Sequence, residues 1–230
     1  MKNTLINRAA TKKIAYALEE LNNDAVFVGS AVVSLYIDDK SADDVRPTKD
    51  IDISLEITTV GELEKIRNRL EQKGFYQSHE DKVVCRFRFE DIKVDVMSTK
   101  EVGWAPANQW FESGFKDLIE VEIDDITVRC LSLPYFLATK FTAFENRGGE
   151  DPRTSHDFED IVYILNHTSR LKKEILSSES KVKKYLIHRF NKIIENSSQH
   201  EAILGNLFHE NQEYRFNKIM KTLNEVCSNS

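Results

Sequence analysis

The stretch that decides the fold runs from Asp50 to Glu56 and reads Asp-Ile-Asp-Ile-Ser-Leu-Glu. Polar and apolar residues alternate along it, which predicts a β-strand with one polar and one apolar face. Asp50 and Asp52 then leave the same face, with their backbones roughly 7 Å apart. Because aspartate is depleted in strands, this pair indicates either a functional site or a solvated sheet face.

Further helices and strands are predicted on both sides of this strand. Before it we expect a helix, a buried strand that ends at Gly29, a second helix and a polar loop, at residues 4–22, 25–28, 31–36 and 38–47. After it we expect an amphipathic helix closed by Gly74, a hairpin and a weaker hairpin, at residues 60–73, 82–97 and 118–131. The two hairpins are predicted to turn at Glu90-Asp91 and Asp124-Asp125.

From Ser132 onward the pattern becomes helical. A polar loop at 148–155 precedes a predicted helix from His156 to Leu165, and the tail from Thr168 is mostly amphipathic helix. The expected fold class is therefore α+β, a small mixed β-sheet core followed by a helical C-terminal domain. We place the boundary near Leu131, which gives domains at residues 1–131 and 132–230.

The composition is that of a folded protein, with 40% hydrophobic and 30% charged residues among 230. The first residues carry charges and no apolar run, so we expect neither a signal peptide nor a membrane span. Cys85, Cys130 and Cys227 are far apart, which fits a reducing compartment and predicts a cytoplasmic protein. The sequence holds no Cys-x-x-Cys pair, which argues against a zinc site.

The net charge of −6 is unevenly distributed. Residues 1–165 carry 21 Lys and Arg against 31 Asp and Glu, a net −10, whereas residues 166–230 carry 11 against 7, a net +4. One interpretation is that the acidic residues 1–165 bind cations and the basic residues 166–230 bind a polyanion. Two ordinary solvated surfaces are the other.

A third strand aspartate, Asp95, lies between Val94 and Val96. Two carboxylates ~4 Å apart repel each other by about 1–4 kcal/mol, so a protein that gathers three needs a compensating cation. Mg²⁺ takes oxygen ligands and binds through a few carboxylates plus substrate phosphates. Two such ions can clamp the attacking and leaving oxygens of an in-line displacement.

Gly29-Ser30 supplies a different kind of group. A small residue at a strand end before a helix lets backbone N–H groups approach a phosphate, and the Ser30 hydroxyl adds a donor. Most glycines at such positions only form a turn. Gly29-Ser30 indicates phosphate binding chiefly because it precedes the Asp-x-Asp strand.

Three segments together resemble the polymerase-beta type nucleotidyltransferase superfamily. They are Val28-Gly29-Ser30-Ala31, the run from Arg46 to Ile53, and Val94-Asp95-Val96. More narrowly, Arg-x-Thr-x-Asp-x-Asp resembles the AbiEii/AbiGii-type toxins of abortive-infection and toxin–antitoxin systems. The helical half of those toxins carries a Lys, then an Arg, then Asp-x-x-Asp followed by a hydrophobic residue. Lys140, Arg147, Asp157, Asp160 and Ile161 stand in that order.

The resemblance implies a role for each matching residue. Asp50, Asp52 and Asp95 are expected to be catalytic and to ligate Mg²⁺, as a two-ion site. The predicted NTP-binding residues are Gly29, Ser30, Thr48, Lys140 and Arg147. Arg46, Asp157 and Asp160 are expected to support them. The helical domain is expected to complete the active site and to contact the acceptor.

The helical residues also have simpler interpretations. Lys140 and Arg147 share one helical face, which can be a charged outer face. Asp157 stands three residues after Thr154, the spacing of a capping-box variant, and can serve to start a helix. Asp160, one turn later, can pair with Lys140 or Arg147 and position it.

The sequence thus predicts a Mg²⁺-dependent nucleotidyltransferase that moves NMP from an NTP to an acceptor hydroxyl and releases pyrophosphate. An RNA 3′ end such as that of tRNA, or a protein, is the expected acceptor, with an antitoxin protein as candidate partner and no membrane partner. A basic stretch from Lys181 to Lys192 is predicted to dock RNA phosphates. An aminoglycoside-type small-molecule transferase and a non-catalytic nucleotide- or antitoxin-binding module are the alternatives.

Overall fold

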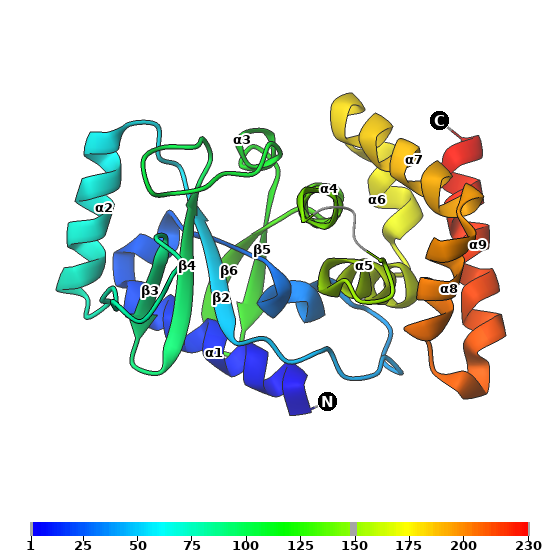
Figure 1. The fold of residues 1–230 in the computed structure, drawn as a ribbon, viewed down its shortest axis with the longest axis horizontal. Helices are drawn as coiled ribbons and strands as arrows, with labels where there is room; N and C mark the ends of the chain where they lie inside the picture. Colours follow the sequence, from blue (N-terminus) through cyan, green and yellow to red (C-terminus); the bar gives the residue numbers. More distant parts are fainter. Residues whose placement is uncertain (1, 148–150, 230) are drawn as a thin grey trace. The chain divides into compact units, whose positions relative to one another are not determined.

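The structure, a computed structural model, describes residues 2–147 and 151–229. The chain divides into two compact units. The sheet unit comprises Met1–Leu35 and Asp43–Ser132, and the helical unit comprises Tyr36–Ala42 and Leu133–Ser230. A mixed sheet in the first half and helices in the second confirm the predicted α+β class (Figure 1).

A six-stranded sheet in the order β3-β4-β2-β1-β6-β5 forms the centre of the sheet unit. Its strands are β1 (Val26–Val28), β2 (Asp50–Leu55), β3 (Arg86–Phe89), β4 (Ile92–Ser98), β5 (Leu118–Ile123) and β6 (Ile126–Leu131). β2 runs parallel to β4, β1 runs parallel to β6, and the other neighbours are antiparallel. The strand of alternating aspartates therefore lies inside the sheet, between β4 and β1.

Both predicted hairpins are confirmed, as β3–β4 and β5–β6. Each turns through two residues whose first member has a left-handed backbone, with φ of 52° at Glu90 and 54° at Asp124. Two-residue hairpin turns require positive φ because their twist must match that of the flanking strands. The turns fix the register, so Arg86 faces Asp95 across β3 and β4.

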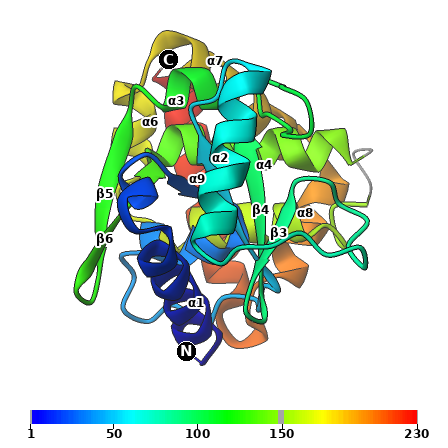
Figure 2. The same cartoon turned by 90° about the vertical axis from the view of Figure 1, so that its left-hand side faces the viewer.

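The helical segments of the sheet unit are α1 (Lys2–Leu18), η1 (Glu19–Asn23), η2 (Ser30–Tyr36), α2 (Val60–Gln72) and α3 (Phe111–Gly114). η2 is a 3₁₀ helix, and α1 packs on β2 and β6. A capping box of Thr59 and Glu62 starts α2, since each side chain accepts a hydrogen bond from the other residue's backbone N–H. In Figure 2 α1 and α2 lie in front of the strands.

The helical unit consists mainly of α4 (Leu133–Asn146), α5 (His156–His167), α6 (Leu171–Ser177), α7 (Ser180–Glu195), α8 (Ser197–Gly205), η3 (His209–Asn211) and α9 (Gln212–Ser228). α4 packs on α5, α6 and α7, and α9 packs on α5 to α8. Ser155 caps α5 by accepting a hydrogen bond from the Phe158 N–H, so the predicted capping role of Thr154 is wrong by one residue. Residues 148–150 of the predicted loop lie outside the described residues.

The helical unit also includes Tyr36–Ala42, here called the clasp segment. The Tyr36 ring stacks on Phe136 with the ring centroids 4.3 Å apart. Asp39 Oδ2 lies 3.0 Å from Nδ1 of the buried His167 and accepts a 2.8 Å hydrogen bond from Arg215 Nη1. These contacts tie a short N-terminal segment to helices from the far end of the sequence.

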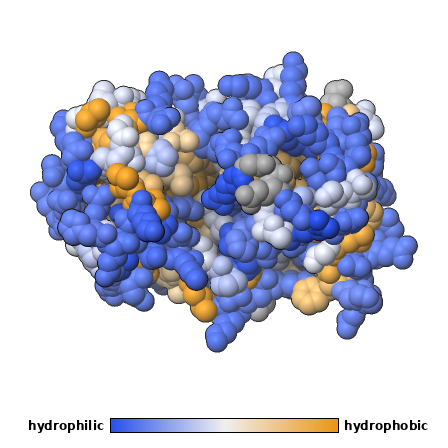
Figure 3. All heavy atoms as spheres, in the orientation of Figure 1, coloured by the Kyte–Doolittle hydropathy of each residue, from blue (hydrophilic) through white to orange (hydrophobic). Residues whose placement is uncertain are grey.

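Figure 3 shows hydrophilic side chains over most of the face in view, as a mean hydropathy of −0.45 predicts. Within residues 2–147 and 151–229, no helix combines the length and the apolar content needed to cross a membrane.

Candidate active site

Gly29 directly follows β1 and lies against the carboxylate of Asp52. Val28 is the register partner of Asp52 in the antiparallel β1–β2 pair. A Cβ built on Gly29 would lie 1.8 Å from Asp52 Oδ2, and Gly29 has a left-handed φ of +72°. Glycine is therefore required here for two reasons, the backbone conformation and the close approach of the carboxylate.

Gly29→Ala is accordingly expected to lower the free energy of unfolding. The left-handed conformation alone costs roughly 1–2 kcal/mol for a residue with a Cβ, and the contact with Asp52 adds to this. Gly61→Ala in α2 is a matched control, because a Cβ there meets nothing within 4 Å. That control should leave the stability unchanged or raise it by up to about 1 kcal/mol. Urea titrations of the two variants measure the difference, and equal stabilities would contradict the account of Gly29.

The three predicted catalytic aspartates lie on neighbouring strands. Asp50 and Asp52 stand at alternate positions of β2, and Asp95 of β4 is the register partner of Asp52 in the parallel pair. The side chains of Asp50 and Asp95 are 35% and 13% exposed. The structure thus gathers on one part of the sheet the three carboxylates that the sequence singled out.

Arg86 of β3 is a site residue that the sequence analysis missed. Its Nε and Nη2 donate to Asp95 Oδ1 and Oδ2, each at 2.7 Å, and Nη2 also donates to Asp50 Oδ2 at 3.1 Å. The Asp95 hydrogen bonds raise the pKa of the guanidinium above its ordinary value. The signal was present in the alternation Arg86-Phe87-Arg88-Phe89, since hairpin pairing with β4 puts the arginine face beside Asp95.

Arg86 bridges two of the carboxylates that the sequence predicts as metal ligands. In the described part of the chain, no group of three or more His, Cys, Asp and Glu side chains is arranged to hold a metal ion. The type of donor nevertheless fits Mg²⁺, because Asp50, Asp52 and Asp95 are carboxylate residues on two adjacent strands.

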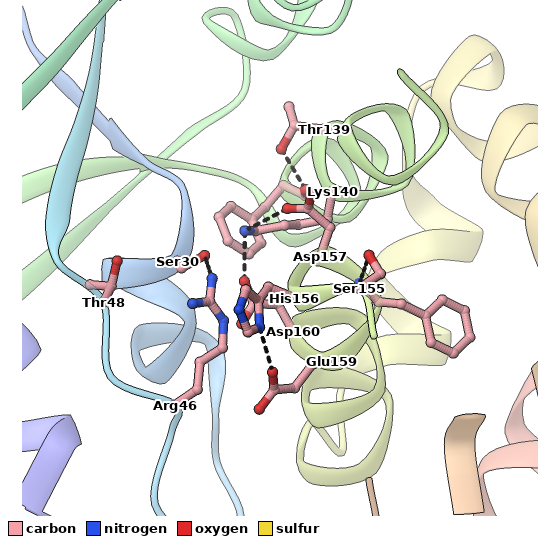
Figure 4. Close-up of polar contacts among 12 residues, drawn as sticks. Ser30, Arg46, Thr48, Thr139, Lys140, Ser155, His156, Asp157, Glu159 and Asp160 are labelled. Atoms are coloured by element: carbon pink, nitrogen blue, oxygen red, sulfur yellow. Dashed lines mark hydrogen bonds and ion pairs between the residues drawn. The ribbon is translucent and has the colours of Figure 1, made fainter. Parts of the chain in front are cut away.

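Thr48 and Arg46 contact the predicted site from the segment that precedes β2. Thr48 Oγ1 donates a 3.0 Å hydrogen bond to Asp50 Oδ1 and so orients that carboxylate. Arg46 Nη2 donates to Ser30 Oγ at the start of η2, as Figure 4 shows. Both residues of the Arg-x-Thr segment thus contact a residue assigned to the site.

In the helical unit, Lys140 of α4 and two aspartates of α5 form a buried ion cluster. Lys140 Nζ lies 2.7 Å from Asp160 Oδ2 and 3.4 Å from Asp157 Oδ1 (Figure 4), and all three side chains are about 5% exposed or less. The predicted pairing of Asp160 with Lys140 is confirmed, whereas an outer-face position for Lys140 is wrong. Arg147 Nη1 lies 2.8 Å from Asp157 Oδ2 and its side chain is 73% exposed.

The Lys140 cluster exists because α4 is buried along nearly its whole length, from Leu133 to Thr142. A buried charge needs partners of opposite sign, and Asp157 and Asp160 provide them from one face of α5. His156, which precedes them, is exposed, and its Nδ1 lies 3.1 Å from Glu159 Oε2.

The fold of this chain is similar to that of a solved nucleotidyltransferase-like protein. A crystal structure of an antigenic nucleotidyltransferase-like protein from Paracoccidioides brasiliensis is similar in fold, with a TM-score of 0.51 and 13% sequence identity. The match covers 84% of this chain and 91% of that one.

The family is shown by sequence. Residues 14–225 match the family described as "Nucleotidyl transferase AbiEii toxin, Type IV TA system", and the chain belongs to that family. Membership implies transferase activity, an NTP substrate and a toxin–antitoxin context. No curated protein sequence matches the chain.

Proposed function

We propose that this protein transfers a nucleoside monophosphate from an NTP to an acceptor hydroxyl, with Mg²⁺, at the carboxylates of β2 and β4. The acceptor oxygen forms a bond to the α-phosphorus, the bond from that phosphorus to the bridging oxygen breaks, and pyrophosphate leaves. The observation that supports this most directly is the pairing of Asp52 with Asp95 beside the Gly29 turn.

Each residue has a proposed part in this reaction. Bound Mg²⁺ would neutralise phosphate charge and polarise the α-phosphoryl group. Asp50, Asp52 and Asp95 are the proposed metal ligands, and Asp95 also orients the acceptor hydroxyl and receives its proton. The backbone N–H groups that follow Gly29 and the hydroxyl of Ser30 are proposed to bind the triphosphate, because a strand-to-helix turn presents such donors to anions.

The remaining assignments concern charge and position. Thr48 orients Asp50 and Arg46 orients Ser30 through the hydrogen bonds described above. Lys140 and Arg147 are proposed NTP-binding residues, and Asp157 and Asp160 hold them by ion pairs. Phosphoryl chemistry depends mainly on positioning and charge neutralisation, so this set of groups is sufficient in kind.

The decisive test is incubation of the protein with each labelled NTP, Mg²⁺ and a total cell lysate, followed by separate RNA and protein gels. Label in RNA or protein, lost in an Asp52→Asn variant, is the expected result. Label only in a small molecule would favour an antibiotic-type transferase. No Asp52-dependent label in any fraction would favour a non-catalytic module.

For the acceptor we propose RNA, docked on the exposed cations of α7. Lys181, Lys184, His188 and Lys192 are exposed and share one face of the helix. Lys183 and Arg189 are more deeply engaged within the unit, since Lys183 Nζ donates to the Leu176 carbonyl at 2.9 Å and Arg189 pairs with Glu145. Lys192 Nζ lies 3.9 Å from the same Glu145 but its side chain stays 51% exposed.

Replacing Lys181, Lys184 and Lys192 by Gln is expected to raise the KM for RNA. The log–log salt dependence of binding should flatten by about 0.7–0.9 per lost phosphate contact, with NTP affinity unchanged. The control replaces the exposed Lys65, Lys82 and Lys116 by Gln, which removes the same charge from the sheet unit. If both triple variants behave alike, α7 has no docking role.

A further inference from the structure

We propose that Arg86 is a built-in counter-ion which occupies the carboxylate centre in the absence of metal and lowers its affinity for a divalent cation until NTP is present. The inference rests on the proposed function of Asp50, Asp52 and Asp95. It goes further because it assigns a competing role to a residue outside that set.

The hydrogen bonds of Arg86 show that a cation already occupies the carboxylates. Arg86 makes two parallel hydrogen bonds of 2.7 Å to the two oxygens of Asp95 and a third, of 3.1 Å, to Asp50. Its side chain is only 15% exposed. A fork-shaped guanidinium suits this bidentate contact better than any other side chain. Two of the three proposed metal ligands are therefore already satisfied by a cation.

The net charge of the centre favours a divalent ion that arrives with a triphosphate over one that arrives alone. Three ionised carboxylates and one guanidinium sum to −2, so without metal the centre is less repulsive than three carboxylates alone. A divalent ion that arrives alone must take oxygens from Arg86 and then lie beside its positive charge. An ion that arrives with a triphosphate brings four phosphate charges of opposite sign, which also give the displaced guanidinium new anionic neighbours.

Arg88 makes the same kind of contact as Arg86, but away from the proposed metal ligands. Arg88 lies two residues along β3, on the same face, and makes a similar side-on pair with Asp81, at 2.7 and 3.1 Å. Asp81 is not among the proposed metal ligands. The two arginines therefore share strand, face and bonding pattern and differ in which carboxylates they hold, which makes Arg88 a matched control.

The test uses the full chain without NTP and titrates Mn²⁺ by calorimetry and by electron paramagnetic resonance. Arg86→Gln is expected to bind Mn²⁺ at least about tenfold more tightly than wild type, since the competing hydrogen bonds to a charged group are gone. Arg88→Gln should bind Mn²⁺ as wild type does. Thermal melts in EDTA and in Mn²⁺ should show a larger metal-induced rise in Tm for Arg86→Gln than for the other two proteins.

Equal or weaker Mn²⁺ binding by Arg86→Gln overturns the proposal. Should that variant fail to fold, Arg86→Lys replaces it, because the lysine keeps the charge but loses the fork. For Arg86→Lys, an affinity for Mn²⁺ that lies between that of wild type and a value about tenfold tighter supports the proposal. An affinity for Mn²⁺ equal to that of wild type refutes it. If Mn²⁺ binding depends on Asp52 but not on Arg86, only this inference is wrong. If binding does not depend on Asp52 in any variant, the proposed function is wrong as well.

Discussion

Asp52→Asn is expected to lower the rate of nucleotide transfer at least ~100-fold and to leave the fold intact. Loss of a group that merely supports a metal ligand costs about 10–100-fold in metal affinity or activity, and a ligand itself should cost more. Asparagine keeps the volume of the side chain, so the contact with Gly29 persists. The repulsion between residue 52 and its neighbour Asp95 falls, so the stability should stay the same or rise slightly.

The measurement is single-turnover transfer of labelled NMP, with the free energy of unfolding measured in parallel. Asp81→Asn is the control, because Asp81 is a 6% exposed carboxylate of the same unit whose partner is Arg88. That change should reduce stability and spare the transfer rate per folded molecule. Near-wild-type transfer by Asp52→Asn would show that the centre of β2 and β4 is not the catalytic site.

Lys140→Ala is expected to destabilise the helical unit by about 3–5 kcal/mol, because breaking a buried ion pair by removing one partner is strongly destabilising. Asp157 and Asp160 are both about 5% exposed and both contact Lys140 Nζ. For a chain of this size the corresponding fall in Tm is roughly 6–20 °C. Arg147→Ala is the control: it removes a 73% exposed partner of the same Asp157 and should cost no more than ~1 kcal/mol.

A further variant separates the stability role of Lys140 from its proposed NTP contact. Lys140→Met combined with Asp157→Asn and Asp160→Asn removes all three buried charges, which should restore much of the stability. If Lys140 also binds phosphate, this folded variant should still bind NTP about tenfold to a hundredfold more weakly, the equivalent of a charged hydrogen bond of roughly 1.5–3 kcal/mol. Wild-type affinity would leave Lys140 a purely structural role.

The sheet of this protein could be predicted from its sequence because local patterns define it. The alternation in Asp50–Leu55 and the residues that flank Glu90-Asp91 and Asp124-Asp125 predict five strands and two turns, all of which the structure contains. Which strands become neighbours is a different matter. β2 lies between β1 and β4, and Val26 of β1 pairs with Arg129 of β6, far along the chain. No local sequence period encodes those pairings.

The parts of the candidate site that could not be predicted depend on such pairings. Arg86 meets Asp95 only through the β3–β4 register, and meets Asp50 only because β4 and β2 are adjacent. Helical periodicity put Lys140 on a face with Arg147, but it cannot show that the face is covered. α5 covers it and supplies the two aspartates that a buried lysine needs.

The clasp segment has a consequence for how the chain is made. Asp39 precedes His167 by 128 residues and Arg215 by 176. At a synthesis rate of about 5–20 residues per second, a nascent chain carries this segment for roughly ten seconds or more before its last anchor is translated. A ribosome that stalls before α9 therefore yields a product whose helical unit lacks an anchor. The helical unit of this toxin-family chain therefore gains its last anchor for the clasp segment only after α9 has been translated.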